Sequence, residues 1–300
     1  MRMLGEGAVC ESAAAVSIVP GPSAALSPAA LPATVVLAEA ARSVAARFGA
    51  AACTYDEQSL LQRTVAERLM TLIDGCGTPS RILDVGCGTG TLTRLLRLRF
   101  PDAVIHAVDI AEGMIECARQ RMGDSRNTEW RVADARSYAP GCTFSLVAGS
   151  SSLHWMAPLS HTIRGLASLL EPGGSFVSAL MVHGTFPELQ AARLRATPQK
   201  PVGTALPETG AVLESLEAAG LELHEHREEL LQTSYDSAGA FLRSLNRQGV
   251  TGTMTGERQL LNRSELRQLG RDYDFHYAHP AGGVFATHRV LYFRARKSER

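Results

Sequence analysis

The segment that most constrains this chain spans residues 82–90 and reads ILDVGCGTG. Its apolar start predicts a buried β-strand, and the leucine pattern behind it predicts a helix. Glycines at 86, 88 and 90 permit positive φ angles and would let a ligand approach main-chain N–H groups at the helix start. A tight turn without a ligand is the alternative, but three alternating glycines would weaken a purely structural turn. The segment therefore predicts a site for a small polar cofactor.

Strand and helix patterns alternate around this segment. Apolar runs at 81–85, 104–109, 130–134, 144–148 and 175–181 predict strands, with helices between them. One helix is expected to carry Leu61 to Ile73 and to end at Gly75, and another to include Leu170 before a turn at 171–174. Such alternation indicates parallel strands joined by right-handed crossovers. Two further strands are expected at 221–231 and 284–293, which predicts an α/β fold with a doubly wound, mostly parallel, Rossmann-like sheet of seven strands.

The chain divides into three compositional regions. Residues 1–33 are dominated by Ala, Ser, Pro and Gly, which predicts a disordered extension. Residues 34–300 are expected to form one domain, with a cofactor-binding core at about 80–181. A proline-punctuated stretch and the long connection between the last two strands predict a helical lid, mainly at 184–206 and 233–282.

Charge and cysteine usage exclude several classes of partner. Thirty Lys and Arg balance thirty Asp and Glu, so no bulk attraction to nucleic acid or to an anionic membrane is expected. No apolar stretch reaches the roughly 18–20 residues that a membrane span needs. The six cysteines are scattered without metal-ligand spacing, and His224 and His226 share a strand face without a third ligand. We therefore expect a cytoplasmic protein with no metal.

The glycine spacing indicates which cofactor binds. Dinucleotide enzymes place a third glycine where this chain has Thr91, and the pattern here is D-x-G-x-G-x-G. In this motif the chain resembles the class I S-adenosylmethionine-dependent methyltransferases. The resemblance implies that the turn holds the methionine part of the cofactor, Asp109 the ribose hydroxyls and Asp134-Ala135 the adenine amino group. Met114 would pack on the adenine ring, unless it is helix core. The expected cofactor-binding set is Asp84, Gly86, Gly88, Gly90, Asp109, Met114, Asp134, Ala135 and Ser150.

A narrower resemblance uses segments outside the core. Residues 149–155 lack the Asn/Asp-Pro-Pro-aromatic stretch of enzymes that methylate nucleic-acid amino groups. The chain instead resembles the malonyl-acyl-carrier-protein O-methyltransferases of biotin synthesis over about residues 35–296. The segments that carry this resemblance are Phe48-Gly49, Tyr55, Gln62-Arg63, His154-Trp155, 184–189 and 241–249. The chain departs from the family pattern at Ser145, Ser150 and Asn246, which bears on cofactor contacts and carrier affinity.

The resemblance implies methyl transfer from S-adenosyl-L-methionine to the free carboxylate of malonyl-acyl-carrier protein or malonyl-CoA. A carboxylate is already ionised at neutral pH, so no general base is needed. Tyr55, His154 and Arg243 are then expected to place the substrate; the alternatives are that Tyr55 lies at a core boundary and that His154, as a lone histidine beside a strand end more often does, has a structural role. Trp155 would shield the sulfonium or belong to the core.

The predicted lid has a basic excess at Arg247, Arg258, Arg263, Arg267 and Arg271. An acidic carrier protein would dock there, unless these arginines are simply a solvated face. Two other functions remain open: methyl transfer to another small carboxylic acid or phenol, and a non-catalytic cofactor-binding module. A nicotinamide-dependent oxidoreductase is disfavoured by Thr91.

Overall fold

The computed structural model describes residues 33–55, 60–123, 126–200, 206–247 and 261–299. Its strands are β1 (Arg81–Val85), β2 (Val104–Asp109), β3 (Thr128–Val132), β4 (Phe144–Ser150), β5 (Leu170–Met181), β6 (Leu221–Tyr235) and β7 (Val284–Lys297). Its α-helices are α1 (Ala33–Tyr55), α2 (Leu60–Ile73), α3 (Thr91–Arg99), α4 (Glu112–Met122), α5 (Leu159–Ser168), α6 (Pro187–Ala196), α7 (Thr209–Ala218), α8 (Ala238–Arg247) and α9 (Arg263–His276).

The seven strands form one sheet in the order β3-β2-β1-β4-β5-β7-β6. The five strands from β3 to β5 are parallel, whereas β7 runs antiparallel to both β5 and β6. From β1 the chain adds β2 and β3 on one side of the sheet and then returns to add β4 and β5 on the other side, so the direction of strand addition reverses between β1 and β4. In open α/β sheets this reversal leaves a crevice at the carboxyl ends of the strands.

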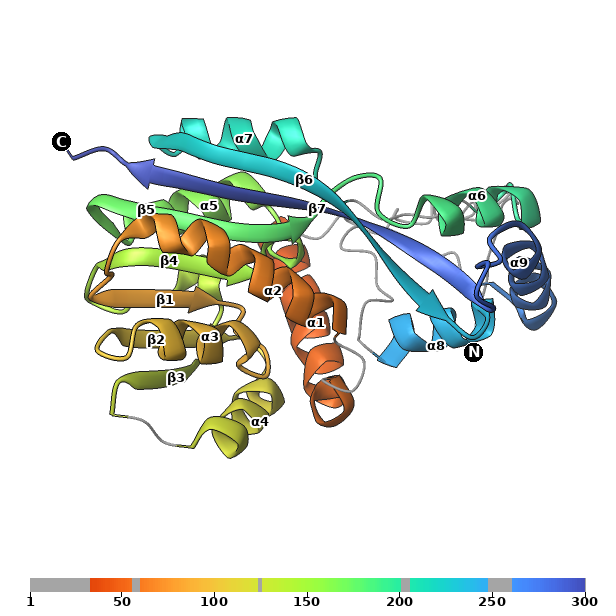
Figure 1. Cartoon of the computed structure of the whole chain (residues 1–300), viewed down its shortest axis with the longest axis horizontal. Helices are drawn as coiled ribbons and strands as arrows, with labels where there is room; N and C mark the ends of the chain where they lie inside the picture. Colours follow the sequence, from red (N-terminus) through yellow and green to blue (C-terminus); the bar gives the residue numbers. More distant parts are fainter. Residues whose placement is uncertain (1–32, 56–59, 124–125, 201–205, 248–260, 300) are drawn as a thin grey trace, which may run out of the picture.

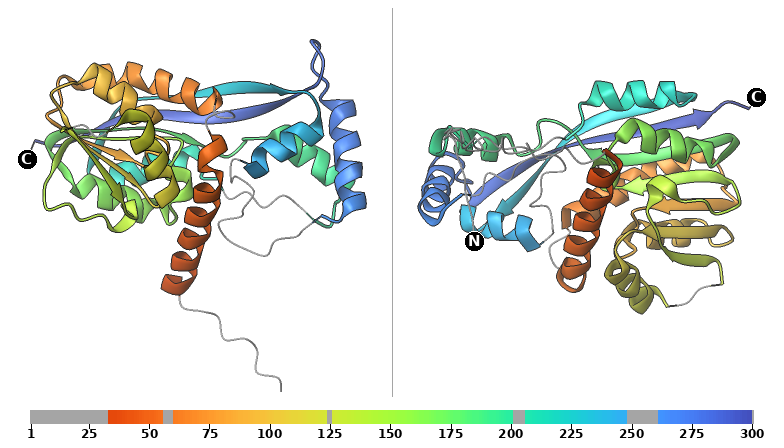
Figure 2. Two further views of the ribbon diagram at one scale, coloured as in Figure 1. Left: turned by 90° about the horizontal axis from the view of Figure 1, so that it is seen from below. Right: turned by 180° about the vertical axis from the view of Figure 1, so that it is seen from behind.

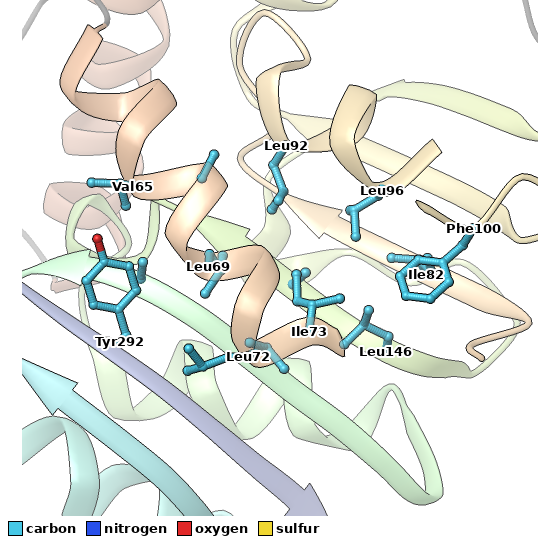
Figure 3. Close-up of a cluster of buried hydrophobic side chains, with 14 of the residues drawn as sticks. Val65, Leu69, Leu72, Ile73, Ile82, Leu92, Leu96, Phe100, Leu146 and Tyr292 are labelled. Atoms are coloured by element: carbon cyan, nitrogen blue, oxygen red, sulfur yellow. The ribbon is translucent and has the colours of Figure 1, made fainter. Parts of the chain in front are cut away.

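Helices cover both faces of the sheet (Figure 1). On one face α2 and α3 bury Leu69, Ile73 and Leu96 against Ile82 of β1, and Figure 3 shows these side chains meeting beneath α2. On the other face α5 and α7 pack against β4, β5 and β7. Since successive residues of a strand point to opposite faces, the buried residues of β1, from Ile82 to Val85, are apolar on both faces apart from Asp84.

A second, smaller hydrophobic cluster lies away from the sheet centre. The long strands β6 and β7 extend beyond the parallel strands and carry α6, α8 and α9 at their far end (Figure 2). Phe241 of α8 and Tyr273 of α9 are fully buried there, and Ala192 of α6 joins them. We call α6, α8 and α9 the lid helices. They fall within the ranges in which the sequence predicts a lid.

The predicted fold class is confirmed, with local corrections. β3 begins and ends two residues earlier than expected, so Asp134 lies beyond it in the loop. Leu170 is not helical: it pairs with Phe144, and the residues at 171–174 form an irregular part of β5 before Ser175 pairs with Leu146. Backbone pairing with β4 thus overrides the local helical pattern. The predicted extension at 1–33 lies outside the described residues except for Ala33, the first residue of α1.

Candidate active site

The glycine turn joins β1 to α3 and holds all three glycines at positive φ: 65° at Gly86, 54° at Gly88 and 87° at Gly90. A Cβ at Gly86 would lie 2.4 Å from the Cβ of Ser152, whereas a Cβ at Gly88 would meet nothing within 4 Å. Gly86 therefore permits a close approach of two loops, and Gly88 leaves an open face.

The turn amides correct one expectation. Gly86 and Cys87 donate to Val108 O, Gly88 to Asp109 Oδ2 and Gly90 to Cys87 O. These four N–H groups are already bonded inside the protein, so they are not free donors for a ligand. Sequence spacing could not show the first three of these bonds, because their acceptors, Val108 O and Asp109 Oδ2, belong to the neighbouring strand β2.

Asp84 lies beneath the turn and is 1% exposed. Its Oδ2 accepts a hydrogen bond of 2.6 Å from Thr93 Oγ1, while its Oδ1 is buried without a partner. Burial, and to a smaller degree the charge of Asp109, raises the pKa of Asp84 to about 7. A buried carboxylate oxygen without a donor is costly, and a cationic or hydrogen-bonding ligand would relieve that cost.

Asp109 ends β2 beside the turn. Its two oxygens accept hydrogen bonds from the backbone N–H groups of Gly88 at 2.9 Å and Ala111 at 2.8 Å. Burial raises the pKa of Asp109, and these hydrogen bonds oppose that shift. Each carboxylate oxygen accepts more than one hydrogen bond, so the group retains acceptor capacity for hydroxyls of a ligand.

Asp134 is held by an unforeseen partner. Arg136 Nη2 lies 2.6 Å from Asp134 Oδ2, Arg136 Nε lies 3.0 Å from Oδ1, and Arg136 Nη1 donates to Ala157 O. Burial disfavours the charge of Asp134, but the hydrogen bonds and charge of Arg136 outweigh it and lower the pKa. The guanidinium orients this carboxylate beside Ala135 at the cleft wall.

Helix α1 supplies one wall that motif analysis missed. Its Val44 and Phe48 line the cleft together with Met114 of α4. The two helices cross closely, since a Cβ on Gly113 of α4 would lie 3.0 Å from the carbonyl oxygen of Gly49. Phe48-Gly49 belongs to the wider resemblance, which was the only sequence signal for this wall. Met114 is 1% exposed and belongs both to the cleft lining and to the apolar contact with α1.

Trp155 closes the cleft opposite the turn. Its ring packs edge-on against Phe48 at 5.5 Å, and the Arg47 guanidinium lies 5.8 Å from the ring centre. Three serines precede it. Ser150, Ser151 and Ser152 all line the cleft, and the Ser152 hydroxyl donates to Val85 O at 2.6 Å. The hydroxyl oxygens of Ser150 and Ser151 are enclosed without a partner.

The three predicted substrate-placing residues are dispersed. His154 is 8% exposed and does not line the cleft. Its Nδ1 accepts from Met181 N at 3.4 Å, and burial lowers its pKa to about 3. Arg243 is exposed on α8 and also lies outside the lining. The side chain of Tyr55 is outside the described part of the structure.

Of the three departures from the family pattern, Ser145 lies far from any cofactor contact. Its hydroxyl accepts from the backbone N–H groups of Ser80 and Arg81 and donates to Arg81 O, at the amino-terminal ends of β4 and β1. The cleft lies at the opposite, carboxyl-terminal edge. Ser145 therefore secures strand pairing and does not bear on cofactor binding, contrary to the expectation. Of the other two, Ser150 lies in the cleft and Asn246 is exposed on α8.

The cleft opens to solvent and has about 990 Å³ of space when its open mouth is included. Along it lie the polar atoms of Asp134, Asp109 and Asp84, at the ends of neighbouring strands β3, β2 and β1, and an apolar wall from α1 and α4. Unpartnered oxygens on Asp84 and Ser150 and the open face of Gly88 suit an elongated ligand with an adenosyl end and a charged end. These residues fit the predicted cofactor.

Two negative findings concern the described residues only. Across these ranges, His, Cys, Asp and Glu side chains do not gather in threes at a distance suited to one metal ion. None of the helices there combines the length and hydropathy of a membrane span. The four cysteines that the structure describes, Cys76, Cys87, Cys117 and Cys142, are free thiols.

Comparisons with known proteins show the family and the fold of this chain. Residues 82–174 match a family described as a methyltransferase domain. A malonyl-acyl-carrier-protein O-methyltransferase of Geobacter sulfurreducens is 33% identical over 84% of this chain and 97% of its own length. One from Halorhodospira halophila is 31% identical over 85% of this chain and 87% of its own. Among solved structures, the YcgJ protein of Bacillus subtilis superposes with a TM-score of 0.54 and 16% identity over 77% of this chain and 98% of its own, which shows a shared fold.

Proposed function

Because this chain belongs to the malonyl-acyl-carrier-protein O-methyltransferase family, we propose that it methylates the free carboxylate of malonyl carried on acyl carrier protein, for biotin synthesis. Its cofactor is S-adenosyl-L-methionine, which supplies an electrophilic methyl group on a sulfonium. The observation that carries the proposal is the cleft, in which the acidic groups at three strand ends and the apolar wall match the parts of this cofactor.

The protein residues position and shield the reactants. Asp109 would accept the ribose hydroxyls, Asp134 and Ala135 would lie at the adenine, and Asp84 and Ser150 would face the methionine end. In the transfer, a carboxylate oxygen forms a bond to the methyl carbon while the carbon–sulfur electron pair stays on sulfur, which becomes a neutral thioether. No proton moves, so no general base is required, and alignment with exclusion of water is the main contribution of the protein.

Phe48 and Trp155 are the residues placed to exclude water. Both line the cleft, and their rings are in contact. The face of an indole attracts cations, so Trp155 also suits a sulfonium. His154, buried and neutral behind Trp155, would support that ring, with which it packs at 5.2 Å between centres. Direct contact of His154 with the substrate stays a prediction.

The lid helices carry a positive surface on which a protein-bound acceptor would dock. Five arginines are exposed on α8 and α9: Arg243, Arg247, Arg263, Arg267 and Arg271. None of them forms an ion pair with a described carboxylate. The acidic residues of α9 are occupied: Glu265 binds Lys200, Asp272 binds Arg195, and Asp274 accepts from Ala238 N. This unbalanced positive surface suits an acidic carrier protein. Arg258 lies outside the described residues.

Kinetics with both acceptors test the proposal. The wild-type protein should methylate malonyl-carrier more efficiently than malonyl-CoA. Reversing the α9 charges, with Arg263, Arg267 and Arg271 all changed to Glu, should raise KM for malonyl-carrier about tenfold or more and leave malonyl-CoA turnover near wild type. Arg164→Glu, on α5 and likewise exposed, is the matched control. No methyl transfer to either acceptor would refute the function, and equal effects on both would refute carrier docking on α9.

We also propose that the protein works in the reducing cytoplasm, because the described cysteines carry free thiols. Biotin-requiring cells that lack this step provide a functional test. The wild-type gene should restore growth without biotin, and an Asp84→Ala version should not.

A further inference from the structure

Ser151 combines two features that are unfavourable unless something compensates for them. It has a φ of 57°, and only one other non-glycine residue in the described chain, Phe186, also has a positive φ. Its hydroxyl oxygen is enclosed and has no hydrogen-bond partner, although the residue lines the cleft. Strained backbone and unpaired polar groups coincide most often at sites that bind a ligand.

The neighbouring bonds fix Ser151 in this conformation. Its backbone N–H donates to Ala179 O at 2.8 Å, which continues the pairing of β4 with β5 by one residue. The next residue, Ser152, is anchored by its hydroxyl to Val85 O, directly against Gly86. The chain must therefore turn within one residue, and the side chain of Ser151 is placed at a defined point just beyond the end of β4.

The strand order indicates what lies at that point. The residues proposed to bind adenine and ribose lie at the carboxyl ends of β3 and β2, and those proposed for the methionine end, Asp84 and Ser150, lie at the ends of the next two strands, β1 and β4. Adjacent strands are about 4.8 Å apart, so the cofactor extends over about two strand spacings, with its sulfonium end toward β4. The next strand end in that direction carries Ser151. An acceptor approaching the methyl group along the sheet edge would meet this residue.

The charges of the described cleft residues favour a neutral donor there. Among the described lining residues, Arg136 is the only cationic side chain, and its guanidinium is already bonded to Asp134 and to Ala157 O. Arg243 lies outside the lining. A carboxylate bound beside β4 would therefore depend on the sulfonium and on neutral hydrogen-bond donors. A hydroxyl also withdraws less charge from the nucleophile than a guanidinium would.

We propose that Ser151 is an acceptor-binding residue whose hydroxyl donates a hydrogen bond to the carboxylate oxygen that does not attack. The proposal rests on the proposed function and adds how the malonyl carboxylate is oriented. Ser151 keeps its proton throughout: the other oxygen forms the bond to the methyl carbon, and the departing electron pair remains on sulfur. The ester product carries no charge, so it accepts a weaker hydrogen bond and leaves more readily.

Two substitutions separate the hydroxyl from the backbone. Ser151→Ala and Ser151→Gly both remove the hydroxyl, but glycine relaxes the positive φ and alanine does not. We expect both to lower kcat/KM for malonyl-carrier about 10- to 100-fold, the usual effect of losing a hydrogen bond to a charged group. The affinity for S-adenosylhomocysteine should stay within about twofold of wild type. If glycine restores activity and alanine does not, the backbone is what matters and the inference is overturned.

Binding measurements with two carriers distinguish a contact between Ser151 and the carboxylate from a purely structural role of Ser151, which would affect both carriers equally. Acetyl-carrier lacks the carboxylate, so its inhibition constant should be the same in wild type and both variants, whereas binding of malonyl-carrier to the S-adenosylhomocysteine complex should weaken. Ser152→Ala is the contrasting variant, since its hydroxyl is committed to Val85 O and its loss should affect both ligands.

The outcomes distinguish this inference from the proposed function. Wild-type methylation of malonyl-carrier with unchanged Ser151 variants would refute the role of Ser151 and leave the function standing. If the wild type does not methylate the carrier, calorimetry of malonate ion with the S-adenosylhomocysteine complex still decides the question. Weaker malonate binding by Ser151→Ala than by wild type would then support carboxylate binding by Ser151, although the proposed methylation of malonyl-carrier is refuted. Equal malonate binding would refute the role of Ser151 as well.

Discussion

Cofactor binding should release a proton from Asp84. Its carboxyl is 1% exposed, and burial raises its pKa to about 7 from an ordinary value of 3.8. The ligand amine would bring a positive charge to the unpartnered Oδ1 and return the pKa toward its ordinary value. At pH 6 about nine in ten free proteins carry this proton and at pH 8 about one in ten, so Kd should fall about tenfold between those values.

The same shift has a consequence for stability without ligand. Because the folded protein binds this proton more tightly than the unfolded chain, the contribution of Asp84 is most favourable below pH 4. It declines as the pH rises to about 7, in total by about 4 kcal/mol. Thermal unfolding of the ligand-free protein should show this decline, and saturating cofactor should reduce it.

Calorimetry in two buffers of different ionisation enthalpy measures the released protons. S-adenosylhomocysteine is the probe, since it binds without turnover. Asp84→Asn is the matched control: it cannot titrate, yet its amide oxygen can still accept the hydrogen bond from Thr93. The difference between the two proteins removes any titration of the ligand itself. Equal proton release by both proteins at pH 6 would refute the reasoning.

Four further substitutions test the site and the lid. Gly86→Ala should abolish cofactor binding, because its Cβ would lie 2.4 Å from the Ser152 side chain. Gly88→Ala meets no protein atom within 4 Å, so it should cost only about 1 kcal/mol of stability from its positive φ, but its Cβ would enter the open face and weaken cofactor affinity; thermal shift and calorimetry compare the two variants. Gly113→Val should push α1 from the cleft and weaken cofactor affinity, with far-UV circular dichroism unchanged. Phe241→Ala should destabilise the lid by about 3–5 kcal/mol and lower kcat/KM for the acceptor while cofactor Kd is retained; a parallel loss of cofactor binding would contradict a separate lid cluster.

Contiguous residues were enough to predict the glycine turn that lines the cleft. The strand, the three glycines and the following helix lie within one short segment, and the turn conformation depends on residues adjacent in the chain. Asp109 could be predicted for the same reason, since it ends the next apolar run. The alternation of apolar segments likewise predicted the layered sheet, because periodicity reports directly which faces are buried.

Long-range contacts explain where prediction ended. The pairing of Arg136 with Asp134 depends on the rotamer of the arginine, which Ala157 O, 21 residues away in the chain, helps to hold by a hydrogen bond. The sequence around Leu170 has a helical pattern, but Leu170 instead pairs with Phe144 of β4, 26 residues earlier in the chain. The Ser145 hydroxyl bonds to Arg81 O, 64 residues earlier in the chain.

The sequence by itself determined the fold class, the reaction family and the position of the cofactor turn, because these depend on local conformational preferences and on the order of apolar segments. Only the tertiary structure decided which polar atoms remain unpaired in the cleft. Hydrogen bonds are short and directional, so whether Asp84 Oδ1 or the Ser151 hydroxyl has a partner depends on the packing of segments far apart in the chain.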